Sequence, residues 1–348
     1  MSQELNFEAK SAQTTPGFLD LAGNPRAVAT LALATYITAL IAAWFTVSPF
    51  IPEQVTLSLF GISKTISDVP SRILRDGSVL LGILPFAFWV ECMVVGWEKC
   101  SVRRFLTGPT ASMKADLALF ALGQVYVLNI VSKVLLIGAS MISGSALRDW
   151  ILAQTGFAID PSGLPFGVQL VLFFYLATFF DYWTHRLDHT RLFWPIHRYH
   201  HSAEDFCVVT TSRQHPAAFT QIIMINVPMA LLGADAEVMI FVNVFVTTLG
   251  FIIHSQITSD WGWIGRWVVQ SPLHHRLHHK LDMTEPTGHF GMAPIWDHLF
   301  GTWYDNAHKY PEIGVAKEYR NGLWFFQDIM RDYFDFWKGL VVKNTDPA

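Results

Sequence analysis

The stretch HRLDHTRLFWPIHRYHH, from His185 to His201, packs five histidines into seventeen residues. Histidine forms helices poorly and its imidazole titrates near neutral pH, so a cluster this dense indicates a chemical role rather than chance composition. All fourteen histidines of the chain lie after residue 184. Histidines that only filled a core would be scattered along the sequence, so this confinement predicts one shared site or surface.

The spacing of these histidines predicts helices that point several imidazoles at one place. Residues three and four apart lie on the same face of a helix. His185 and His189 are four residues apart, and the pattern H-x-x-H-H occurs twice. Its two copies are His197, His200 and His201, and His275, His278 and His279.

Histidines in this arrangement favour a site for two metal ions. An imidazole nitrogen is a ligand of intermediate softness that suits iron, zinc, copper and nickel. One zinc ion takes about four protein ligands, and the eight histidines of these patterns exceed that number. A metal-handling membrane protein is an alternative, but transport sites lie near the bilayer midplane in interrupted helices, whereas these patterns follow the apolar segments.

The composition predicts an integral membrane protein. Of the 348 residues, 51% are hydrophobic and 15% are charged, against about 25% charged residues in soluble domains, and the mean hydropathy is positive. The net charge of -4 offers no basic face to nucleic acid. The three cysteines form neither a disulfide framework nor a metal motif, so we expect free thiols.

Six apolar runs are candidates for membrane segments. A helix needs about 20 apolar residues to cross the hydrocarbon core. Two closely spaced runs, at 217–234 and 238–253, form either two crossings or a hairpin that dips into one leaflet. Four separate runs predict spanning helices at 27–51, 79–97, 117–142 and 161–180.

Three other segments have their own character. Residues 1–25 are mostly polar and lack the features of a signal peptide, so we expect a short flexible tail. Residues 56–77 are semi-polar and predict a short interfacial helix. Near the C-terminus, apolar residues recur at helical spacing and predict a helix that packs on the domain or lies in the membrane interface. This stripe comprises Leu323, Phe326, Met330, Tyr333 and Trp337.

The distribution of basic residues predicts the orientation in the membrane, because short cytoplasmic loops are rich in Lys and Arg. The loop between the second and third predicted spans carries Lys99, Arg103, Arg104 and Lys114. The next loop carries only Arg148. The histidine-rich region after residue 181 is therefore expected on the cytoplasmic side, and we expect a bacterial inner membrane rather than the endoplasmic reticulum.

The sequence segments that contain the histidines resemble those of a known protein family. DYWTHRLDH, HRYHHSAEDFCVVTTSRQHP, SPLHHRLHH and PIWDHLFGTW resemble, in this order, the boxes of the fatty acid hydroxylase/sterol desaturase superfamily of membrane di-iron oxygenases. The matching text covers roughly residues 181–304. HHRLHH and the preceding IHSQI look most like the alkylglycerol monooxygenase and bacterial sterol-desaturase-like branch. The first 150 residues carry no such match.

The resemblance implies an O2-dependent oxidation of a C–H bond in a lipid or sterol-like amphiphile, with hydroxylation favoured over desaturation. It implies two iron ions, for which zinc can substitute in purified protein. The chain has no heme-domain His-Pro-Gly-Gly motif, no glycine-rich dinucleotide motif and no cysteine cluster. We therefore expect a separate electron donor protein.

The resemblance also implies a set of metal ligands. His254 joins the box histidines because the superfamily places a further histidine between its second and third boxes. This residue ends an apolar run, where an unpaired polar ring is costly, and its alternative is a buried histidine bonded to a carbonyl. The implied ligands are His185, His189, His197, His200, His201, His254, His275, His278 and His279.

Charged residues near the boxes are candidates for supporting the ligands. Asp181 lies four residues before His185 and is placed to accept the other ring N–H of that ligand. Arg213 is a candidate partner for Glu204, and such a pair would tie the second box to the following loop. The alternative for these residues is solvated charge at the membrane interface. Further candidate carboxylates are Asp188 and Asp297.

Three histidines outside the boxes are left open. Where the superfamily usually has Asn, this chain has His289, which is an extra ligand, a proton donor near bound O2 or an unrelated loop residue. His274 is adjacent to His275 on a helix and must point elsewhere. His215 has no assigned role.

Together these features predict an all-α integral membrane protein with about four transmembrane helices, a hydrophobic hairpin and a cytoplasmic helical cap that holds a dinuclear histidine site. A zinc-dependent hydrolase or isomerase is the alternative enzyme, but its carboxylate general base would have to be Asp188, which flanks a ligand. The expected regions are a tail at 1–25, a transmembrane region at 26–160, a histidine-box domain at 161–305 and an amphipathic helix and tail at 306–348.

Overall fold

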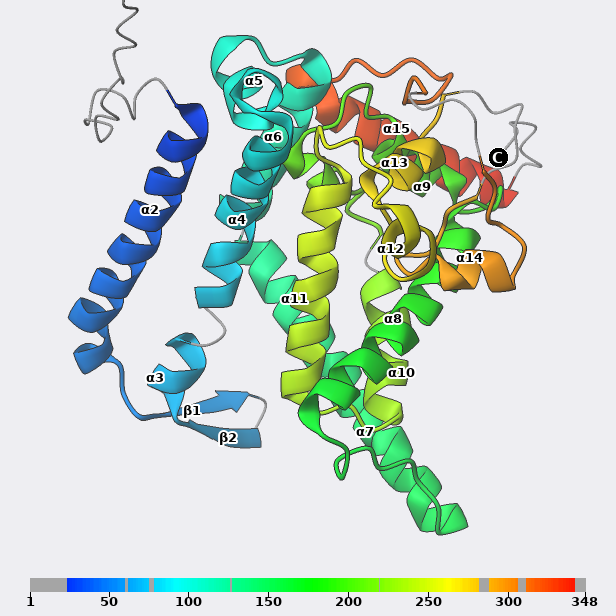
Figure 1. The fold of residues 1–348 in the computed structure, drawn as a ribbon. Coiled ribbons are helices and arrows are strands. Elements are labelled where there is room, and N and C mark those ends of the chain that lie inside the picture. Colours follow the sequence, from blue (N-terminus) through cyan, green and yellow to red (C-terminus); the bar gives the residue numbers. More distant parts are fainter. Residues whose placement is uncertain are drawn as a thin grey trace, which may run out of the picture.

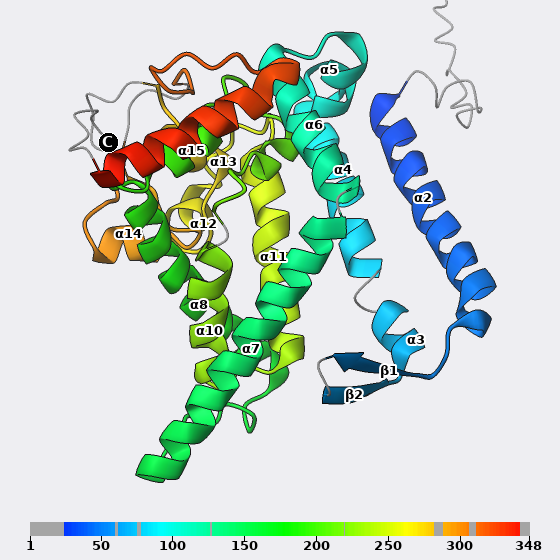
Figure 2. The same cartoon turned by 180° about the vertical axis from the view of Figure 1, so that it is seen from behind.

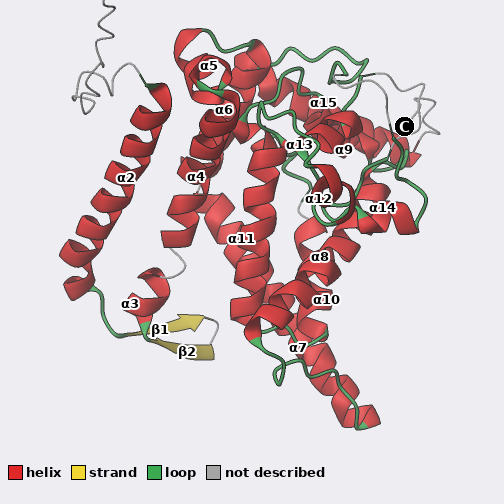
Figure 3. Cartoon of the chain, viewed as in Figure 1, coloured by secondary structure: helices red, strands yellow, loops and turns green. Residues whose placement is uncertain are grey.

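A computed structural model describes residues 24–59, 62–74, 78–125, 127–218, 220–281, 288–305 and 311–341. The chain is mostly helical in this part, with one short pair of strands and several loops, as Figure 3 shows. The predicted helical membrane architecture is thereby confirmed. The expected N-terminal tail lies, apart from its last two residues, outside the described residues.

Within the described residues, three helical segments are long and apolar enough to span a membrane. The first joins α2 (Pro25–Val47) to the 3-10 turn η1 (Ser48–Phe50), and the others are α8 (Phe166–Asp188) and α11 (Ala236–Ile253). Helix α4 (Ser78–Val95) is also apolar, but its apolar part is shorter. The number of four spans therefore stays a prediction.

The expected interfacial helix at 56–77 is wrong in its first half, which forms an antiparallel hairpin of β1 (Gln54–Leu59) and β2 (Ile62–Ser67). The physical reason is that QVTLSL alternates polar and apolar residues with a period of two, and that ISKTIS has three β-branched residues, Ile62, Thr65 and Ile66, which suit a strand. Helix α3 (Val69–Arg72) follows. Figure 1 shows this hairpin between α2 and α4, at the end of both helices that lies away from the histidine region.

The predicted third span at 117–142 falls on two helices and stays a prediction, because residue 126 between them lies outside the described residues. The two helices are α6 (Ala111–Val125) and α7 (Val127–Thr155). Asp116 of α6 is fully buried in an ion pair with Arg213, so the start of this helix belongs to the histidine region rather than to lipid. The segments η3 (Trp97–Lys99) and α5 (Ser101–Thr107) link α4 to α6.

The hydrophobic hairpin at 217–253 is present as α10 (Thr220–Leu231) and α11. Helix α10 has 12 residues, too few to cross a bilayer alone. It packs closely on α7, where an added Cβ on Gly144 would lie 2.6 Å from Val227 O and from Ala230 Cβ. Phe173 of α8, Met229 of α10 and Val242 of α11 meet in one apolar core, which holds the hairpin against the spanning helix.

Short helices form a cap over one end of α8 and α11. They are α9 (Trp194–His201), η4 (Val208–Ser212), α12 (Gly262–Trp267), α13 (Pro272–His278), α14 (Ile295–Leu299), η5 (Gly322–Trp324) and α15 (Phe325–Val341). Figure 2 shows α15 lying across the back of the cap beside α9.

Helix α15 packs on the cap through a mixed face of Asp328, Ile329 and Asp332 rather than through the predicted apolar stripe. Asp332 is fully buried and accepts a hydrogen bond from Arg198 of α9 at 2.6 Å. Phe326 and Trp337, in contrast, are 63% and 50% exposed. Ion pairing to α9 thus decides which face turns inward, and the aromatic stripe faces outward.

Candidate metal centre

Five histidines from α8, α9 and α13 converge in the cap, and we call them the five-histidine group. Helix α8 ends at Asp188, so its last turn carries the first box into the cap. Each residue of this group offers one ring nitrogen, and these five nitrogens all lie within 4.8 Å of one another. Its members are His185, His189, His197, His201 and His278.

Four more histidines form a second set, the four-histidine group, under the same 4.8 Å limit. All four are buried, and His254 reaches the site from the C-terminal end of α11. Its members are His200, His254, His275 and His279. The nine histidines predicted as ligands are thus all brought together, five in one group and four in the other.

Backbone carbonyls and one amide fix the orientation of five of these rings. His185 Nδ1 lies 2.8 Å from Phe290 O, and His278 Nδ1 lies 2.7 Å from Gly288 O. A carbonyl only accepts, so each Nδ1 must carry the proton. The same holds for three rings of the four-histidine group, whose acceptors are Arg213 O for His200, Gly250 O for His254 and Gln270 Oε1 for His275.

With Nδ1 protonated, each neutral ring presents an unprotonated Nε2 to the centre. His254 Nε2 lies 2.8 Å from His275 Nε2 and 3.3 Å from His200 Nε2. Three lone pairs at these distances cannot hydrogen-bond to one another, because none of the three atoms has a proton to donate. A cation among them satisfies all three, so the donor set fits a metal ion.

Buried ring nitrogens without hydrogen-bond partners also indicate a metal site. His189 Nε2, His278 Nε2 and both ring nitrogens of His279 are buried and have no hydrogen-bond partner among the described residues. Burial lowers the pKa of His279 well below its usual value and that of His254 to about 4. Both rings are therefore neutral at pH 7, which is the form that binds metals.

Asp297 supports the site one step away from the ligands. It accepts hydrogen bonds from Phe290 N and Gly291 N, each at 2.8 Å, and from Thr302 Oγ1 at 2.7 Å. Burial raises the pKa of Asp297 to about 6, against the lowering effect of these bonds. Because Phe290 O is the acceptor for His185, Asp297 holds the loop that orients this ring.

Asp181 does not take its predicted position as the partner of His185, whereas Asp188, a further candidate, does lie beside a ligand ring. Asp181 is not the acceptor for His185, since both ring nitrogens of His185 face other groups, Phe290 O and His197 Nε2. Asp188 lies beside a different ring, with Oδ2 at 3.8 Å from His197 Nδ1. One helical turn brings Asp181 to the face of His185, but the loop carbonyl reaches the ring instead.

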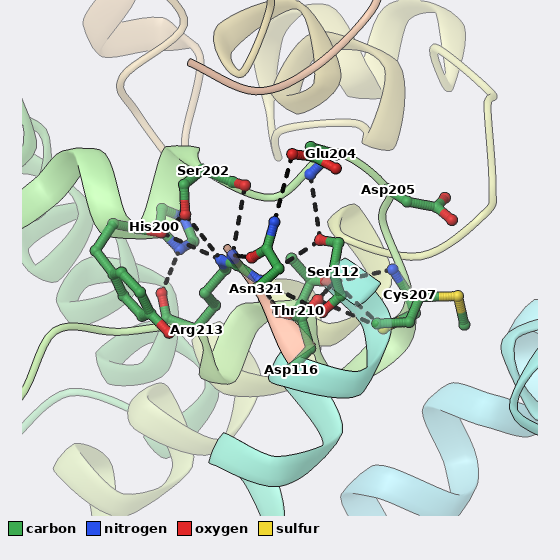
Figure 4. A network of polar contacts seen from close by, with 12 residues as sticks. Ser112, Asp116, His200, Ser202, Glu204, Asp205, Cys207, Thr210, Arg213 and Asn321 are labelled. Atoms are coloured by element: carbon green, nitrogen blue, oxygen red, sulfur yellow. Dashed lines mark hydrogen bonds and ion pairs between the residues drawn. The ribbon is translucent and has the colours of Figure 1, made fainter. Parts of the chain in front are cut away.

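The predicted Arg213–Glu204 pair is wrong, because Arg213 pairs with Asp116 of α6 at 2.7 Å, and both are fully buried (Figure 4). Asn321 stands between the predicted partners and accepts a hydrogen bond from Arg213 while donating one to Glu204 at 3.4 Å. Since Arg213 O is the acceptor for His200, this network ties α6 and the C-terminal region to the four-histidine group. The sequence offers one hint of this role for Asp116, which is its position as an isolated acidic residue directly before an apolar run.

His289 lies outside both histidine groups. Its buried ring packs at 4.6 Å from the Trp303 ring and 4.4 Å from the Tyr304 ring, and its backbone has φ 59°. Its carbonyl accepts a hydrogen bond from Gln270 Nε2 at 2.5 Å, and Gln270 in turn holds His275. His289 therefore supports the site through its backbone.

The two other open histidines have structural contacts. His274 Nδ1 lies 2.8 Å from Ser271 Oγ, at the start of α13. His215 Nε2 lies 3.1 Å from Ile329 O, which fastens α15 to the cap. Neither ring belongs to a histidine group in the described part of the chain.

A cavity of about 770 Å³ is lined by residues of both histidine groups and by residues of several apolar helices. His185, His200 and His254 line one end. The rest of the wall is mainly apolar and comes from α2, α4, α6 and α11. Representative residues are Tyr36, Leu81, Phe120 and Phe251.

Comparisons with known proteins confirm the resemblance. Residues 170–302 match the fatty acid hydroxylase family. The chain is 30% identical to ornithine lipid hydroxylase OlsE of Rhizobium tropici over 47% of this chain and 50% of that protein. It is 30% and 29% identical to the alkylglycerol monooxygenases of Xenopus tropicalis and Homo sapiens, over 37% of this chain and 29% of each of those proteins. The chain thus spans half or less of the length of these relatives, and no solved structure matches it.

Proposed function

We propose that this chain, matched over residues 170–302 to the fatty acid hydroxylase family, is an integral membrane oxygenase. It would insert an oxygen atom of O2 into a C–H bond of a lipid or sterol-like amphiphile, with hydroxylation favoured over desaturation. The observation that carries the proposal is the meeting of two buried histidine groups with an apolar cavity whose walls are membrane-embedded helices. The names of the relatives, a lipid hydroxylase and alkylglycerol monooxygenases, point to the same chemistry.

The two histidine groups would hold two iron ions, one in each. When bound, iron supplies the activation of O2 and the removal of hydrogen from an unactivated carbon. Purified protein is expected to take up zinc as well, because the order of affinities does not favour Fe(II) at nitrogen sites. Zinc in a preparation would therefore leave the proposal standing.

The residues of the chain have three tasks in this reaction. The carbonyls of Phe290, Gly250 and Gly288 hold the protons of three rings, which keeps each Nε2 free for a metal. The cavity seats the alkyl chain beside these rings and excludes water. Burial keeps the rings neutral, so the centre stays cationic and attracts electrons.

The electrons would come from a separate donor protein that docks on the cytoplasmic face of the cap. The basic loop supports this orientation, because Arg104 donates hydrogen bonds to Asp205, next to the second box. Loop and cap therefore lie on one side of the membrane, expected to be the cytoplasmic side of a bacterial inner membrane. A reporter fused after Arg104 should be cytoplasmic and one near Asp149 external, and the reverse would invert this orientation.

Oxygen labelling tests the function. Membranes that contain the protein, a reductant and a lipid extract should consume O2 and transfer label from 18O2 into a lipid product. A single zinc ion per chain with no O2 consumption would instead support a hydrolase or isomerase. Metal movement into vesicles without lipid oxidation would support a metal-handling protein.

A further inference from the structure

A carboxylate lines the cavity in a position that the metal centre does not explain. Asp181 belongs to the cavity wall together with His185 and the apolar residues of α4 and α11. We propose that Asp181 accepts a hydrogen bond from an ammonium or hydroxyl group of the substrate, while the alkyl chain of that substrate fills the apolar end of the cavity. This inference rests on the proposed function only where it concerns the carbon that is oxidised.

The position of Asp181 on α8 puts its carboxylate next to the metal end of the cavity. Asp181 precedes His185 by four residues, so both side chains project from one face of the helix. Four residues correspond to about 6 Å along a helix axis. A group bound to Asp181 is therefore about one helical turn from the nearest histidine of the five-histidine group.

The Asp181 carboxylate has no hydrogen-bond or ion-pair partner among the residues that the structure describes. The charged group that acts on it is Asp188, which has the same sign and offers no compensation. An unpaired carboxylate in apolar surroundings is costly. A donor group of a bound amphiphile would offset this cost.

The amide side chains in the same wall are already engaged. Gln270 bridges His289 O and His275 Nδ1. Gln214 Nε2 donates a hydrogen bond to Thr211 O at 3.4 Å. Asp181 is the one carboxylate in the described lining, and it is left to recognise a ligand.

The opposite end of the cavity suits an alkyl chain. Tyr36 of α2 donates a hydrogen bond to Leu81 O of α4 at 3.1 Å, which joins these two apolar helices at the cavity. Phe120 and Val246 continue the apolar lining. A volume of about 770 Å³ is in the range of small-molecule sites. With the polar group at Asp181 and the chain in this apolar part, the oxidised carbon lies near the polar end of the substrate rather than at its chain terminus.

Ligand binding by the purified, metal-containing protein under argon tests this inference without turnover. The probes are dodecylamine, dodecanol and methyl dodecyl ether, which share a chain length, although the ether has no donor. Each is titrated while thermal unfolding is followed, because a ligand of the native state raises the unfolding temperature. We expect the amine, the alcohol or both to bind more tightly than the ether, and the stronger of the two identifies the donor.

The variant Asp181→Asn should lose this preference, with the affinity for the preferred donor falling about tenfold or more. Asp160→Asn, the same change at an exposed residue before α8, is the control and should keep the preference. Equal binding of all three probes by the parent, or an unchanged preference in Asp181→Asn, would overturn the inference. Loss of metal from Asp181→Asn would also overturn it, by assigning Asp181 to the metal centre. An absence of 18O transfer would sink the proposed function but leave this binding result standing.

Discussion

The rings of His201 and His279 stack with centroids 4.0 Å apart and planes 14° apart. His201 belongs to the five-histidine group and His279 to the four-histidine group, so the two groups contact each other through this pair of rings. Each group is assembled from boxes far apart in the sequence. Two metal ions held on either side of this ring pair would be close enough to act together on one substrate.

Gln270 should matter more for the affinity of one group than for that of the other. It accepts a hydrogen bond from His275 directly. It acts on the five-histidine group only through His289 O, in the loop whose neighbouring carbonyls orient His185 and His278. Gln270→Leu is expected to lower the metal affinity of the four-histidine group by about 10- to 100-fold, the usual effect of losing a partner that orients a ligand. Titration with a chelator should then release one metal well before the other. Gln327→Leu, at an exposed position of α15, is the control, and simultaneous release of both metals would contradict the assignment.

The buried pair of Asp116 and Arg213 should matter for stability. Asp116→Asn leaves Arg213 charged and fully buried, so the free energy of unfolding is expected to fall by about 3 kcal/mol. Glu98→Gln is the control, because Glu98 pairs with Arg103 at the surface and should contribute less than about 1 kcal/mol. Denaturant unfolding measures both variants. Equal effects of the two substitutions would show that the network around Arg213 is not a structural anchor.

The metal-free protein should lose stability in mild acid. Burial lowers the pKa of His254 to about 4 and that of the other cap histidines below the value of 6.5 that they have when unfolded. The folded state therefore binds fewer protons, and its stability is full above pH 6.5 and falls as the pH drops from 6.5 toward 4. Thermal unfolding after chelation, measured between pH 7.5 and 4.5, checks this. A midpoint that does not change over this range would contradict the burial of neutral rings.

His289→Asn should keep both metals. The ring lies outside both histidine groups, and the backbone at this position has φ 59°, which Asn tolerates better than most residues. Because the ring packs on Trp303 and Tyr304, we expect an altered but not abolished turnover. Elemental analysis together with an assay of lipid oxidation measures this. Loss of one metal from the variant would make His289 a ligand.

Helical spacing made the histidine groups predictable, because residues three and four apart must share a face whatever the rest of the fold does. His254 was reached by resemblance alone. The hydrogen-bond acceptors for the rings could not be predicted from the sequence, because the carbonyls of Phe290 and Gly250 are backbone groups that every residue has. The partner of Arg213 was also hidden, because no local pattern links it to Asp116.

The secondary structure was predictable where one hydrophobic pattern dominated a segment, and less so where two patterns competed. The apolar runs of α2, α8 and α11 were long enough to identify as helices. The segment at 56–77 was expected to be helical, but the alternation of polar and apolar residues in QVTLSL favours the strand that pairs with β2. In α15, the helix was predicted, but the face that packs on the cap was not, because it includes Asp332, whose partner Arg198 lies far away in the sequence.

The metal content of protein produced in iron-supplemented cells is the most direct test of the central claim. Elemental analysis should find two iron ions per chain in the parent. His200→Ala combined with His278→Ala removes one ligand from each group and should reduce this content, while His298→Ala, outside both groups, should not. A single metal ion per parent chain, or an unchanged content in the double variant, would contradict a centre of two metals held by nine histidines.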